Sequence, residues 1–365
     1  MKYCCQDCGR EWDYPVLVCV FCGGVVSKVD ISRYVVDEVV TVNVPSDDHP
    51  LIPYYVLMLK DSDGSYHFQK TFQRHNIGDI VNVCRSLQKT YTIGIVGTGI
   101  TGKGIAEVAL LSGSRIVWKS RSRSALINAI EVLSKKLSKR MSPDEAETLL
   151  ENITTATEWE PLSVSDFVIE SITEDLYVKR DAFRILDQIC PPNVVLATNT
   201  SSLQISRISE GLLHPERVAG LHFFNPIARM QLVEIVRGKK TADETIDKCR
   251  ALVASLNKVD VVVADTPGFI VNRLLFVMIN TACRMLDEGV AEVEDIDRAM
   301  KLGANYPMGP FELADLIGLD LCLEIIRNLH ESSQGREYEA SLALKKLVSA
   351  GCLGRKTGRG FYQYP

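Results

Sequence analysis

The sequence predicts an α/β chain with a mostly parallel sheet, an all-α domain after it and a small β-rich segment before it. Strands and helices alternate from residue 91 onward, and helical periodicity alone continues after residue 266. Short apolar runs separated by turn residues precede both parts. Because parallel strands need a crossover between them, the alternation favours a parallel sheet covered by helices. The expected parts are residues 1–30, 31–88, 91–265 and 266–365.

The composition is that of a globular protein with room for two or three cores, since 46% of its 365 residues are hydrophobic and 24% are charged. A formal net charge of -5 gives no overall basic field, so we expect neither nucleic acid nor a membrane surface as the main partner. The longest apolar stretch, residues 268–277, contains Asn272 and Arg273 and is much shorter than the ~20 residues of a membrane-spanning helix.

Four of the eleven cysteines form two Cys-x-x-Cys-Gly pairs near the start of the chain. Two such turns bring four thiolates into the tetrahedron that zinc prefers, and the metal stabilises a segment with few apolar residues. We therefore expect a zinc ribbon with a structural zinc ion held by Cys5, Cys8, Cys19 and Cys22. Cys4 could replace one ligand, and a redox-active dithiol is the alternative interpretation. The odd number of cysteines and the absence of an apolar leader favour a cytoplasmic location.

Residues 31–88 alternate apolar and polar side chains in short runs, separated by turn signals such as Asp61-Ser62-Asp63-Gly64. This pattern predicts a small five-stranded β-barrel of the OB type. With the Cys-x-x-Cys-Gly pairs, the segments Pro53-Tyr54 and Ile77-Gly78-Asp79 resemble the acyl-CoA-associated zinc-ribbon/OB-fold family. That resemblance implies a docking or thioester-carrier role. Nucleic acid, which other OB folds bind, is the minor alternative because no dense Lys/Arg stripe is present.

After a polar joint at residues 84–90, strands and helices follow one another in regular order. The expected elements are a strand over 91–97, a helix over 103–112, a strand over 115–119, a helical region over 124–150, a strand over 166–170, a helix over 175–189 and strands over 193–197 and 217–224. Beyond Asp265-Thr266-Pro267-Gly268, apolar residues recur at helical spacing, first at Ile270 and Leu274 and later at Leu313 and Leu316. This periodicity indicates a separate helical domain.

The run from Ile93 to Gly102 contains the pattern G-x-G-x-x-G between an apolar strand and an apolar helix. In this pattern Gly97 makes the tight turn, Gly99 lets the backbone approach a pyrophosphate, and Gly102 brings the helix close to the strand. Free N–H groups at the start of the helix favour negative charge there. A glycine turn formed for packing alone is the other interpretation, but the flanking strand and helix favour a Rossmann domain that binds a dinucleotide.

Several polar residues fall where predicted strands end, at the sheet edge that faces the ligand in a parallel α/β domain. Glu170 ends one strand, Asn199 follows another, and His222 lies near the end of the last. A lone histidine on an apolar strand is more often a hydrogen-bonded core residue than a catalyst. The motifs around His222 favour a catalytic role over a core role.

Six ordered motifs between residue 91 and the carboxyl end resemble the L-3-hydroxyacyl-CoA dehydrogenase family. They are Asn199-Thr200-Ser201-Ser202-Leu203, His222-Phe223-Phe224-Asn225-Pro226, Leu232-Val233-Glu234, the segment from Asp265 to Arg273, Pro307-Met308-Gly309-Pro310-Phe311 and Gly354-Arg355-Lys356-Thr357-Gly358. The resemblance implies a Rossmann domain, a helical domain that forms a homodimer, and hydride exchange between a nicotinamide cofactor and C3 of an acyl thioester. Residues 1–90 lie outside it.

By this resemblance His222 is the general base and acid, Glu234 holds the far ring nitrogen of the histidine, and Ser201 and Asn272 hold the reacting oxygen. The residue chemistry agrees, because imidazole titrates near neutral pH and neutral donors stabilise a developing alkoxide. Other roles stay open at this stage. Ser201 could cap a helix, Glu234 could form an ordinary ion pair, and Asn272 could cap a helical turn.

Further residues are expected to contact the cofactor. Glu174, Lys179 and Lys356 match family positions of this kind, and Asn199 joins them at its strand end. A basic helical face lies where the family receives the phosphates of CoA, and it consists of Lys135, Lys136, Lys139 and Arg140. An acidic carrier-protein surface would suit the same charges, and a solvated face without a partner is the other interpretation.

NAD enzymes usually carry Asp or Glu about 20 residues after the glycine turn, where the carboxylate binds the adenosine ribose. This chain has Ser120 there, followed by Arg121, Ser122 and Arg123. Without the carboxylate, two guanidinium groups and small hydroxyls suit a 2′-phosphate. We therefore expect NADP to be favoured over NAD, with Ser120, Arg121 and Arg123 binding the cofactor. Two solvent-facing arginines are the alternative.

Taken together, these features predict a 3-hydroxyacyl-thioester dehydrogenase that acts on acyl-CoA. One alternative is a dehydrogenase for a hydroxyacyl group on an acyl-carrier protein, docked by the amino-terminal part. The other is a non-catalytic scaffold that keeps only the nucleotide site. The complete set of Ser201, His222, Glu234 and Asn272 argues against the scaffold.

Overall fold

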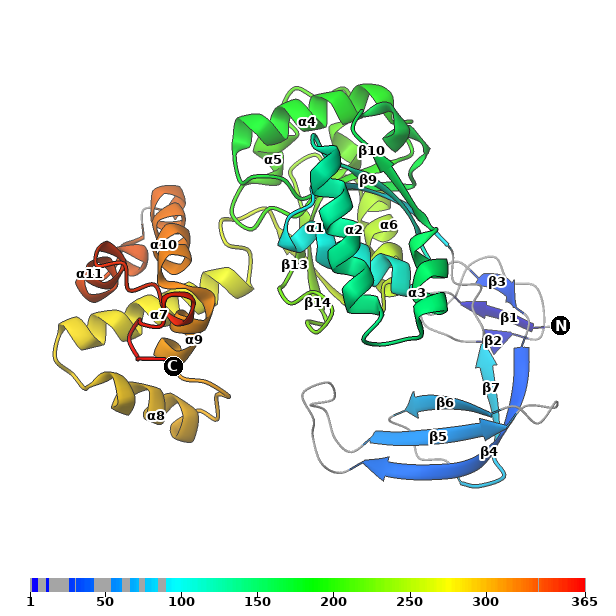
Figure 1. Ribbon diagram of the computed structural model, residues 1–365, viewed down its shortest axis with the longest axis horizontal. Helices are drawn as coiled ribbons and strands as arrows, with labels where there is room; N and C mark the ends of the chain where they lie inside the picture. Colours follow the sequence, from blue (N-terminus) through cyan, green and yellow to red (C-terminus); the bar gives the residue numbers. More distant parts are fainter. Residues whose placement is uncertain are drawn as a thin grey trace. The chain divides into compact units, whose positions relative to one another are not determined.

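The computed structural model describes residues 2–5, 11–12, 26–29, 31–42, 54–60, 66–71, 76–84, 90–333 and 335–364 (Figure 1). The chain divides into two compact units, Met1–Thr90 and Tyr91–Pro365. Within these described ranges, none of the helices has both the length and the apolar character needed to cross a membrane.

The first sheet of the amino-terminal unit has three antiparallel strands. β1 (Lys2–Cys5) lies between β2 (Glu11–Trp12) and β3 (Val26–Val29). Three of the four predicted zinc ligands, Cys8, Cys19 and Cys22, lie outside the described residues. The zinc ribbon therefore stays a prediction.

The second sheet of this unit has the strand order β6-β5-β4-β7 and is antiparallel throughout. Its strands are β4 (Ile31–Val42), β5 (Tyr54–Lys60), β6 (Tyr66–Thr71) and β7 (Ile80–Cys84). Buried Val36, Leu57 and Leu59 form its small core. Within the described ranges four strands are present and β6 does not pair with β7, so the closed five-stranded barrel stays a prediction.

The second unit is built on an eight-stranded sheet of order β10-β9-β8-β11-β12-β13-β14-β15. Its strands are β8 (Thr92–Val96), β9 (Arg115–Lys119), β10 (Ile153–Ala156), β11 (Phe167–Glu170), β12 (Val195–Thr198), β13 (Val218–Phe223), β14 (Leu232–Arg237) and β15 (Val259–Ala264). Neighbours are parallel from β10 to β13, β14 is antiparallel to β13, and β15 is parallel to β14. The predicted mostly parallel sheet is confirmed.

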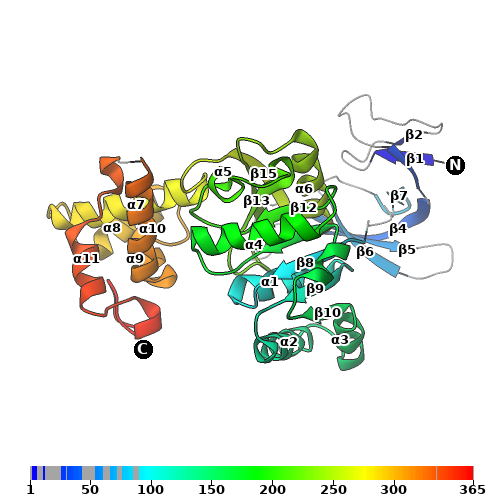
Figure 2. The same cartoon turned by 90° about the horizontal axis from the view of Figure 1, so that it is seen from above.

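Helices cover both faces of this sheet and give a three-layered domain (Figure 2). One face packs against α1 (Ile100–Leu111), α2 (Arg123–Leu137), α3 (Pro143–Leu150) and α6 (Asp243–Ser255). The other packs against α4 (Leu176–Ile189), α5 (Ile205–Ile208) and the 3-10 turn η1 (Glu160–Val164). The chain leaves β8 toward β9 and later crosses back to β11, so the carboxyl ends of β8 and β11 flank the ligand crevice of this fold class.

Some predicted boundaries are wrong for identifiable reasons. The helical region over 124–150 is two helices, because Ser142 and Glu145 form a capping box that starts α3 at Pro143. Helix α1 begins at Ile100 rather than 103, since Gly99 is its N-cap. Three strands were not predicted: β10, β14 and β15. β10 is an edge strand with exposed Thr154 and Thr155, and β15 is an edge strand whose run of valines is interrupted by Asp260 alone. Neither shows the alternation on which a strand prediction depends.

The carboxy-terminal part is helical, as predicted. Its helices are α7 (Val271–Asp287), α8 (Val293–Gly303), α9 (Pro310–Ile317), α10 (Leu319–Ser333) and α11 (Leu342–Ser349), with short turns η3 (Arg336–Tyr338) and η4 (Arg355–Thr357). Helix α7 packs against α9, α10 and α11 around a core that includes Phe276, Phe311 and Ile326. Two buried carboxylates support this packing: Asp297 accepts backbone N–H groups from the start of α9, and Asp315 accepts those of Phe361 and Tyr362.

Candidate active site

A histidine and a glutamate face each other across two neighbouring strands. His222 of β13 and Glu234 of β14 are register partners, so their side chains project on the same side of the sheet. Nδ1 of His222 and Oε2 of Glu234 are 2.7 Å apart. Both residues are buried, with exposed fractions of 5% and 0%. A carboxylate at Nδ1 holds the proton on that nitrogen and leaves Nε2 as the acceptor.

The other carboxylate oxygen of Glu234 is held by the start of helix α7. Oε1 accepts hydrogen bonds of 3.0 Å from the backbone N–H groups of Ile270 and Val271. The first N–H groups of a helix lack partners within it and carry partial positive charge, so they stabilise the carboxylate and fix its orientation. Asn272 follows Val271 directly and is 8% exposed. The same helix start therefore positions Glu234 and Asn272.

Two phenylalanine rings enclose the imidazole of His222. The ring centroids of Phe224 and Phe269 lie 4.5 Å and 5.5 Å from that of the histidine. The histidine is thus buried and hydrogen bonded, as a core histidine would be. Its place distinguishes it, because it lies next to the last residue of β13, at the edge to which the parallel strands bring their carboxyl ends.

Glu174 organises the loop that carries Ser201. Its Oε1 accepts hydrogen bonds from the hydroxyl of Thr200, the N–H groups of Ser201 and Ser202, and the hydroxyl of Ser202. Burial by itself raises the pKa of the Glu174 carboxyl, but the charge of Lys179 and these hydrogen bonds outweigh it, and the pKa lies below its ordinary value. Glu174 therefore acts as a negatively charged anchor for this loop.

Asn199 joins that loop to the strand of the histidine. Its Oδ1 accepts a 2.9 Å hydrogen bond from the backbone N–H of Phe223. Ser201 lies two residues after Asn199, and His222 lies one residue before Phe223. The structure thus brings the Ser201 loop next to the histidine, as the sequence predicted for the two strand ends.

Lys179 is buried between two carboxylates. Its Nζ lies 2.7 Å from Oε1 of Glu170 and 3.3 Å from Oε2 of Glu174, and the residue is 1% exposed. Glu170 also accepts hydrogen bonds from Thr198 and from the N–H of Ile172. Here Lys179 neutralises and positions the carboxylates beneath the strand ends, and its predicted contact with a cofactor stays a prediction.

The glycine turn combines two positions that exclude a side chain with one that faces open space. At Gly97, whose φ is +114°, an added Cβ would lie 2.3 Å from the carbonyl oxygen of Ser171, and at Gly102 it would lie 2.3 Å from that of Gly97. At Gly99 it would meet no atom within 4 Å. Two of the glycines are therefore required by the turn itself, and the third leaves open space beside the start of α1.

The segment Ser120 to Arg123 follows β9 directly and leads into α2. Arg121 and Arg123 are exposed, and Ser122 caps the helix by accepting the N–H of Ala125. The sheet order places this segment at the carboxyl end of the strand next to β8. In a Rossmann fold that is the place of the adenosine ribose.

Other predicted contacts lie in different surroundings. Lys356 belongs to the helical domain, where its ammonium pairs with both oxygens of Asp320, one of them 2.6 Å away. The predicted basic face is helical only in part, because α2 ends at Leu137 and Lys139 and Arg140 follow it. Lys136 and Arg140 pair with the buried carboxylate of Glu107 at 3.1 Å and 3.5 Å. Two of the four basic residues of that face therefore neutralise a buried carboxylate of the fold.

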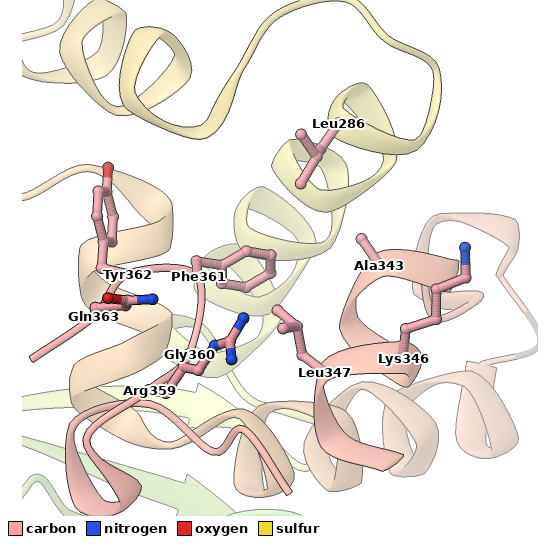
Figure 3. A pocket seen from close by; sticks show the side chains of 9 residues that line it. All are labelled: Leu286, Ala343, Lys346, Leu347, Arg359, Gly360, Phe361, Tyr362 and Gln363. Carbon is pink, nitrogen blue, oxygen red and sulfur yellow. The ribbon is translucent and has the colours of Figure 1, made fainter. Parts of the chain in front are cut away.

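A pocket of about 390 Å³ lies in the helical domain (Figure 3). It is lined by Leu286, Ala343, Lys346, Leu347, Arg359, Gly360, Phe361, Tyr362 and Gln363. None of the predicted catalytic residues lines it. The catalytic assignment therefore depends on the sheet edge and not on this pocket.

Three residues near the glycine turn were missed by the sequence reasoning. Trp118 is fully buried, and its indole N–H donates a 2.9 Å hydrogen bond to the carbonyl of Gly97. Lys119 is also buried, and its ammonium lies 4.2 Å from the ring centroid of Trp159. A lysine at the end of an otherwise apolar strand was the signal that could have drawn attention to this corner.

A doubly wound sheet with a glycine turn after its first strand, and a buried histidine and glutamate pair at its carboxyl edge, define a nicotinamide-dependent Rossmann dehydrogenase. Comparison with known families makes this specific. The profile described as "3-hydroxyacyl-CoA dehydrogenase, NAD binding domain" matches residues 92–266, and "3-hydroxyacyl-CoA dehydrogenase, C-terminal domain" matches residues 268–364. The chain belongs to the 3-hydroxyacyl-CoA dehydrogenase family and is an oxidoreductase acting on a CH–OH group.

Individual relatives agree with this assignment. A 3-hydroxybutyryl-CoA dehydrogenase of Clostridioides difficile is 42% identical over 278 residues, which are 74% of this chain and 99% of that protein. The mitochondrial hydroxyacyl-coenzyme A dehydrogenase of Sus scrofa is 42% identical over 282 residues, 74% of this chain and 90% of that protein. The crystal structure of (S)-3-hydroxybutyryl-CoA dehydrogenase from Ralstonia eutropha superposes with a TM-score of 0.72 at 38% identity, covering 76% of this chain and 100% of that chain.

Proposed function

We propose that this chain interconverts a 3-hydroxyacyl-CoA and the corresponding 3-oxoacyl-CoA, with His222 as the general base and acid. The observation that supports this most is the 2.7 Å contact between His222 and Glu234 at the carboxyl edge of the sheet. The names of the relatives support 3-hydroxybutyryl-CoA, a short acyl chain, as the substrate.

Each residue of the site has a separate part in the proton transfer. Nε2 of His222 takes the proton of the C3 hydroxyl during oxidation and returns it during reduction. Glu234 stabilises the imidazolium that forms and keeps the ring oriented, because its own second oxygen is fixed by α7. Ser201 and Asn272 hold the C3 oxygen through neutral donors, which do not compete with His222 for the proton.

The residues around the glycine turn fit a dinucleotide. The space beside the backbone of Gly99 is open, so a pyrophosphate can approach the backbone there. The N–H groups at the start of α1 face the same space. Asn199, Glu174 and Lys179 lie further along the same sheet edge, toward His222. When bound, the nicotinamide ring supplies the hydride chemistry at C3.

Substitution of the histidine tests the assignment. His222→Gln should lower kcat on 3-oxobutyryl-CoA by roughly a hundredfold to ten-thousandfold, because a positioned acid-base group contributes about that much. The Kd of the reduced cofactor, measured by calorimetry, should stay within twofold. Glu234→Gln should lower kcat by a smaller factor, since the ring keeps its place but loses the negative partner. His214→Gln, at an exposed histidine, serves as the control, and wild-type turnover of His222→Gln contradicts the proposal.

For the cofactor, we propose a preference for NADPH over NADH. Ser120 occupies the position after β9 where a carboxylate would repel a phosphate, and Arg121 and Arg123 beside it are exposed. Among the described residues neither arginine forms an ion pair with a carboxylate, and exposed guanidinium groups at this position suit an anion. A higher kcat/KM for NADPH than for NADH is the expected result, and the reverse order overturns the preference.

For the amino-terminal unit, we propose a zinc ribbon followed by an OB-like barrel. β1 ends at Cys5 and pairs with β2 from Glu11, so Cys8 lies in the connection between the two strands. The second pair, Cys19 and Cys22, lies between β2 and β3, and Val26 of β3 is the register partner of Cys5. The two Cys-x-x-Cys-Gly pairs support one tetrahedral zinc site.

We also propose a homodimer in the cytoplasm. The helical domain exposes large apolar side chains, including Val290 at 58%, Leu302 at 81% and Leu342 at 60%, which a second copy would cover. The described cysteines Cys190, Cys249, Cys283, Cys322 and Cys352 are free thiols. Burial raises the pKa of Cys249 and of Cys322 to about 12, with nearby carboxylates adding to the rise at Cys322, and free thiols persist in a reducing compartment.

A further inference from the structure

Lys119 is a buried lysine that has neither a hydrogen-bond partner nor an ion-pair partner for its ammonium among the described residues. It is the last residue of β9 and is only 2% exposed. In the described part of the chain its Nζ forms neither a hydrogen bond nor an ion pair, and its close partner is the ring of Trp159, 4.2 Å away at the centroid. A buried ammonium is normally paired with a carboxylate, as Lys179 is, or capped by carbonyls, as Lys258 is.

The surroundings of Lys119 form a corner at the carboxyl ends of β9 and β10. Ala156, the last residue of β10, is the register partner of Lys119, and its carbonyl accepts the N–H of Ser120. Trp159 follows three residues later. Burial lowers the pKa of the Lys119 ammonium below its ordinary value; the exposed Glu158 opposes this shift and Arg121 adds to it. The corner therefore holds two cations close enough to repel each other.

We propose that Lys119 is the inner cation of a phosphate site completed by Arg121 and Arg123, and that this site takes the 2′-phosphate on the adenosine of NADPH. The proposal rests on the NADPH preference proposed above and names a residue that determines it. The position favours this phosphate over the diphosphate, because the diphosphate belongs to the glycine turn after β8 and the adenosine ribose to the end of β9.

The charge and the burial of Lys119 explain why it would bind a phosphate. An ammonium shielded by an indole ring interacts with an anion more strongly than one in open water, because the local dielectric constant is lower. Without an anion the same burial is unfavourable. Removing the charge should therefore leave the folded state as stable as before, or make it more stable, while weakening a bound phosphate.

Calorimetric binding of adenosine phosphates tests the site without turnover. The probes are adenosine 2′,5′-bisphosphate, adenosine 3′,5′-bisphosphate and adenosine 5′-monophosphate; the 3′,5′ compound carries the phosphate pattern of CoA. In the full-length protein, Lys119→Met should raise the Kd of the 2′,5′-bisphosphate about tenfold or more, because a charge-assisted contact is lost. The Kd of the monophosphate should change less than twofold.

Three controls separate the possible outcomes. Lys248→Met removes one positive charge from α6, far along the sequence, and should change no Kd. Lys119→Gln is a second neutral variant, and thermal melting of each variant should show a Tm no lower than that of the wild type. Equal losses for all three probes, or a larger loss for the 3′,5′-bisphosphate, overturn the proposal. The dehydrogenase assignment is judged separately, by the turnover of the wild-type enzyme and of His222→Gln, so failure of the phosphate site does not count against it.

Discussion

Glu170 and Glu234 show how one residue type acquires two roles. Both are fully buried, and each accepts three hydrogen bonds: Glu170 from Lys179, Thr198 and the N–H of Ile172, Glu234 from His222 and two N–H groups of α7. A buried carboxylate persists only with such partners. One partner of Glu234 is an ionisable ring at the sheet edge, whereas the cation of Glu170 is enclosed. In the proposed mechanism Glu234 therefore supports proton transfer, and Glu170 does not.

At the same scale, the arginine pair after β9 gives a direct prediction. Arg121→Ala should raise KM for NADPH about tenfold while KM for NADH changes less than twofold, because a guanidinium contacts a phosphate that NADH lacks. Steady-state kinetics with both cofactors provides the measurement. Arg207→Ala, an exposed arginine on α5, is the matched control. A uniform rise of both KM values would show that Arg121 supports the fold of the loop instead.

At the scale of the element, the glycine turn combines a required conformation with open space. Gly97 has a φ that side chains rarely adopt, and the carbonyl of this residue is fixed by Trp118. Gly99 has an ordinary φ of -66° and serves as the N-cap of α1. The backbone conformation thus requires the first glycine, and we expect the middle one to matter for what binds there.

This difference predicts opposite behaviour for two alanine variants. Gly97→Ala should lower the free energy of unfolding by about 2 kcal/mol or more, because positive φ and a close carbonyl both oppose the methyl group. Gly99→Ala should melt at the wild-type Tm but bind NADPH and NADH at least tenfold more weakly, since the methyl group occupies the open space. Thermal melting and calorimetry measure the two effects. Unchanged cofactor binding by Gly99→Ala would contradict the assigned role.

At the scale of the whole molecule, the dehydrogenase is a unit of its own. Residues 91–365 contain the eight-stranded sheet, its two helical layers and the carboxy-terminal bundle, each with buried apolar cores. The family profiles match within the same residues. The amino-terminal unit adds separate sheets with a small core.

The fragment 91–365 should therefore fold and keep kcat/KM on 3-oxobutyryl-CoA within about twofold of the full chain, because the unit buries its own cores. Sedimentation should give the mass of a dimer for both proteins. Metal analysis should find about one zinc ion per full-length chain and none in the fragment. A monomeric fragment would contradict dimerisation through the helical domain, and a metal-free full-length chain would contradict the zinc ribbon.

Much of the site could be predicted because its residues lie at strand ends. His222, Glu170 and Asn199 occupy ends of strands in a parallel sheet, and such ends meet at one edge whatever the details of packing. The start of α3 could not be placed by apolar periodicity, although Ser142 and Pro143 carried a capping signal. The pairing of Lys136 and Arg140 with Glu107 was equally hidden, because it depends on how α2 packs against α1.

The sequence by itself determined the mostly parallel sheet followed by a helical domain, the glycine turn and the family, since these depend on local spacing and on motifs that can be read along the chain. Only the tertiary structure decided which partner each buried charge has. It placed His222 against Glu234 through the register of two antiparallel strands, gave Lys179 two carboxylates, and set the ammonium of Lys119 over the ring of Trp159. The reason is that a charge in a low-dielectric interior is governed by its neighbours in space, and these are often distant along the chain.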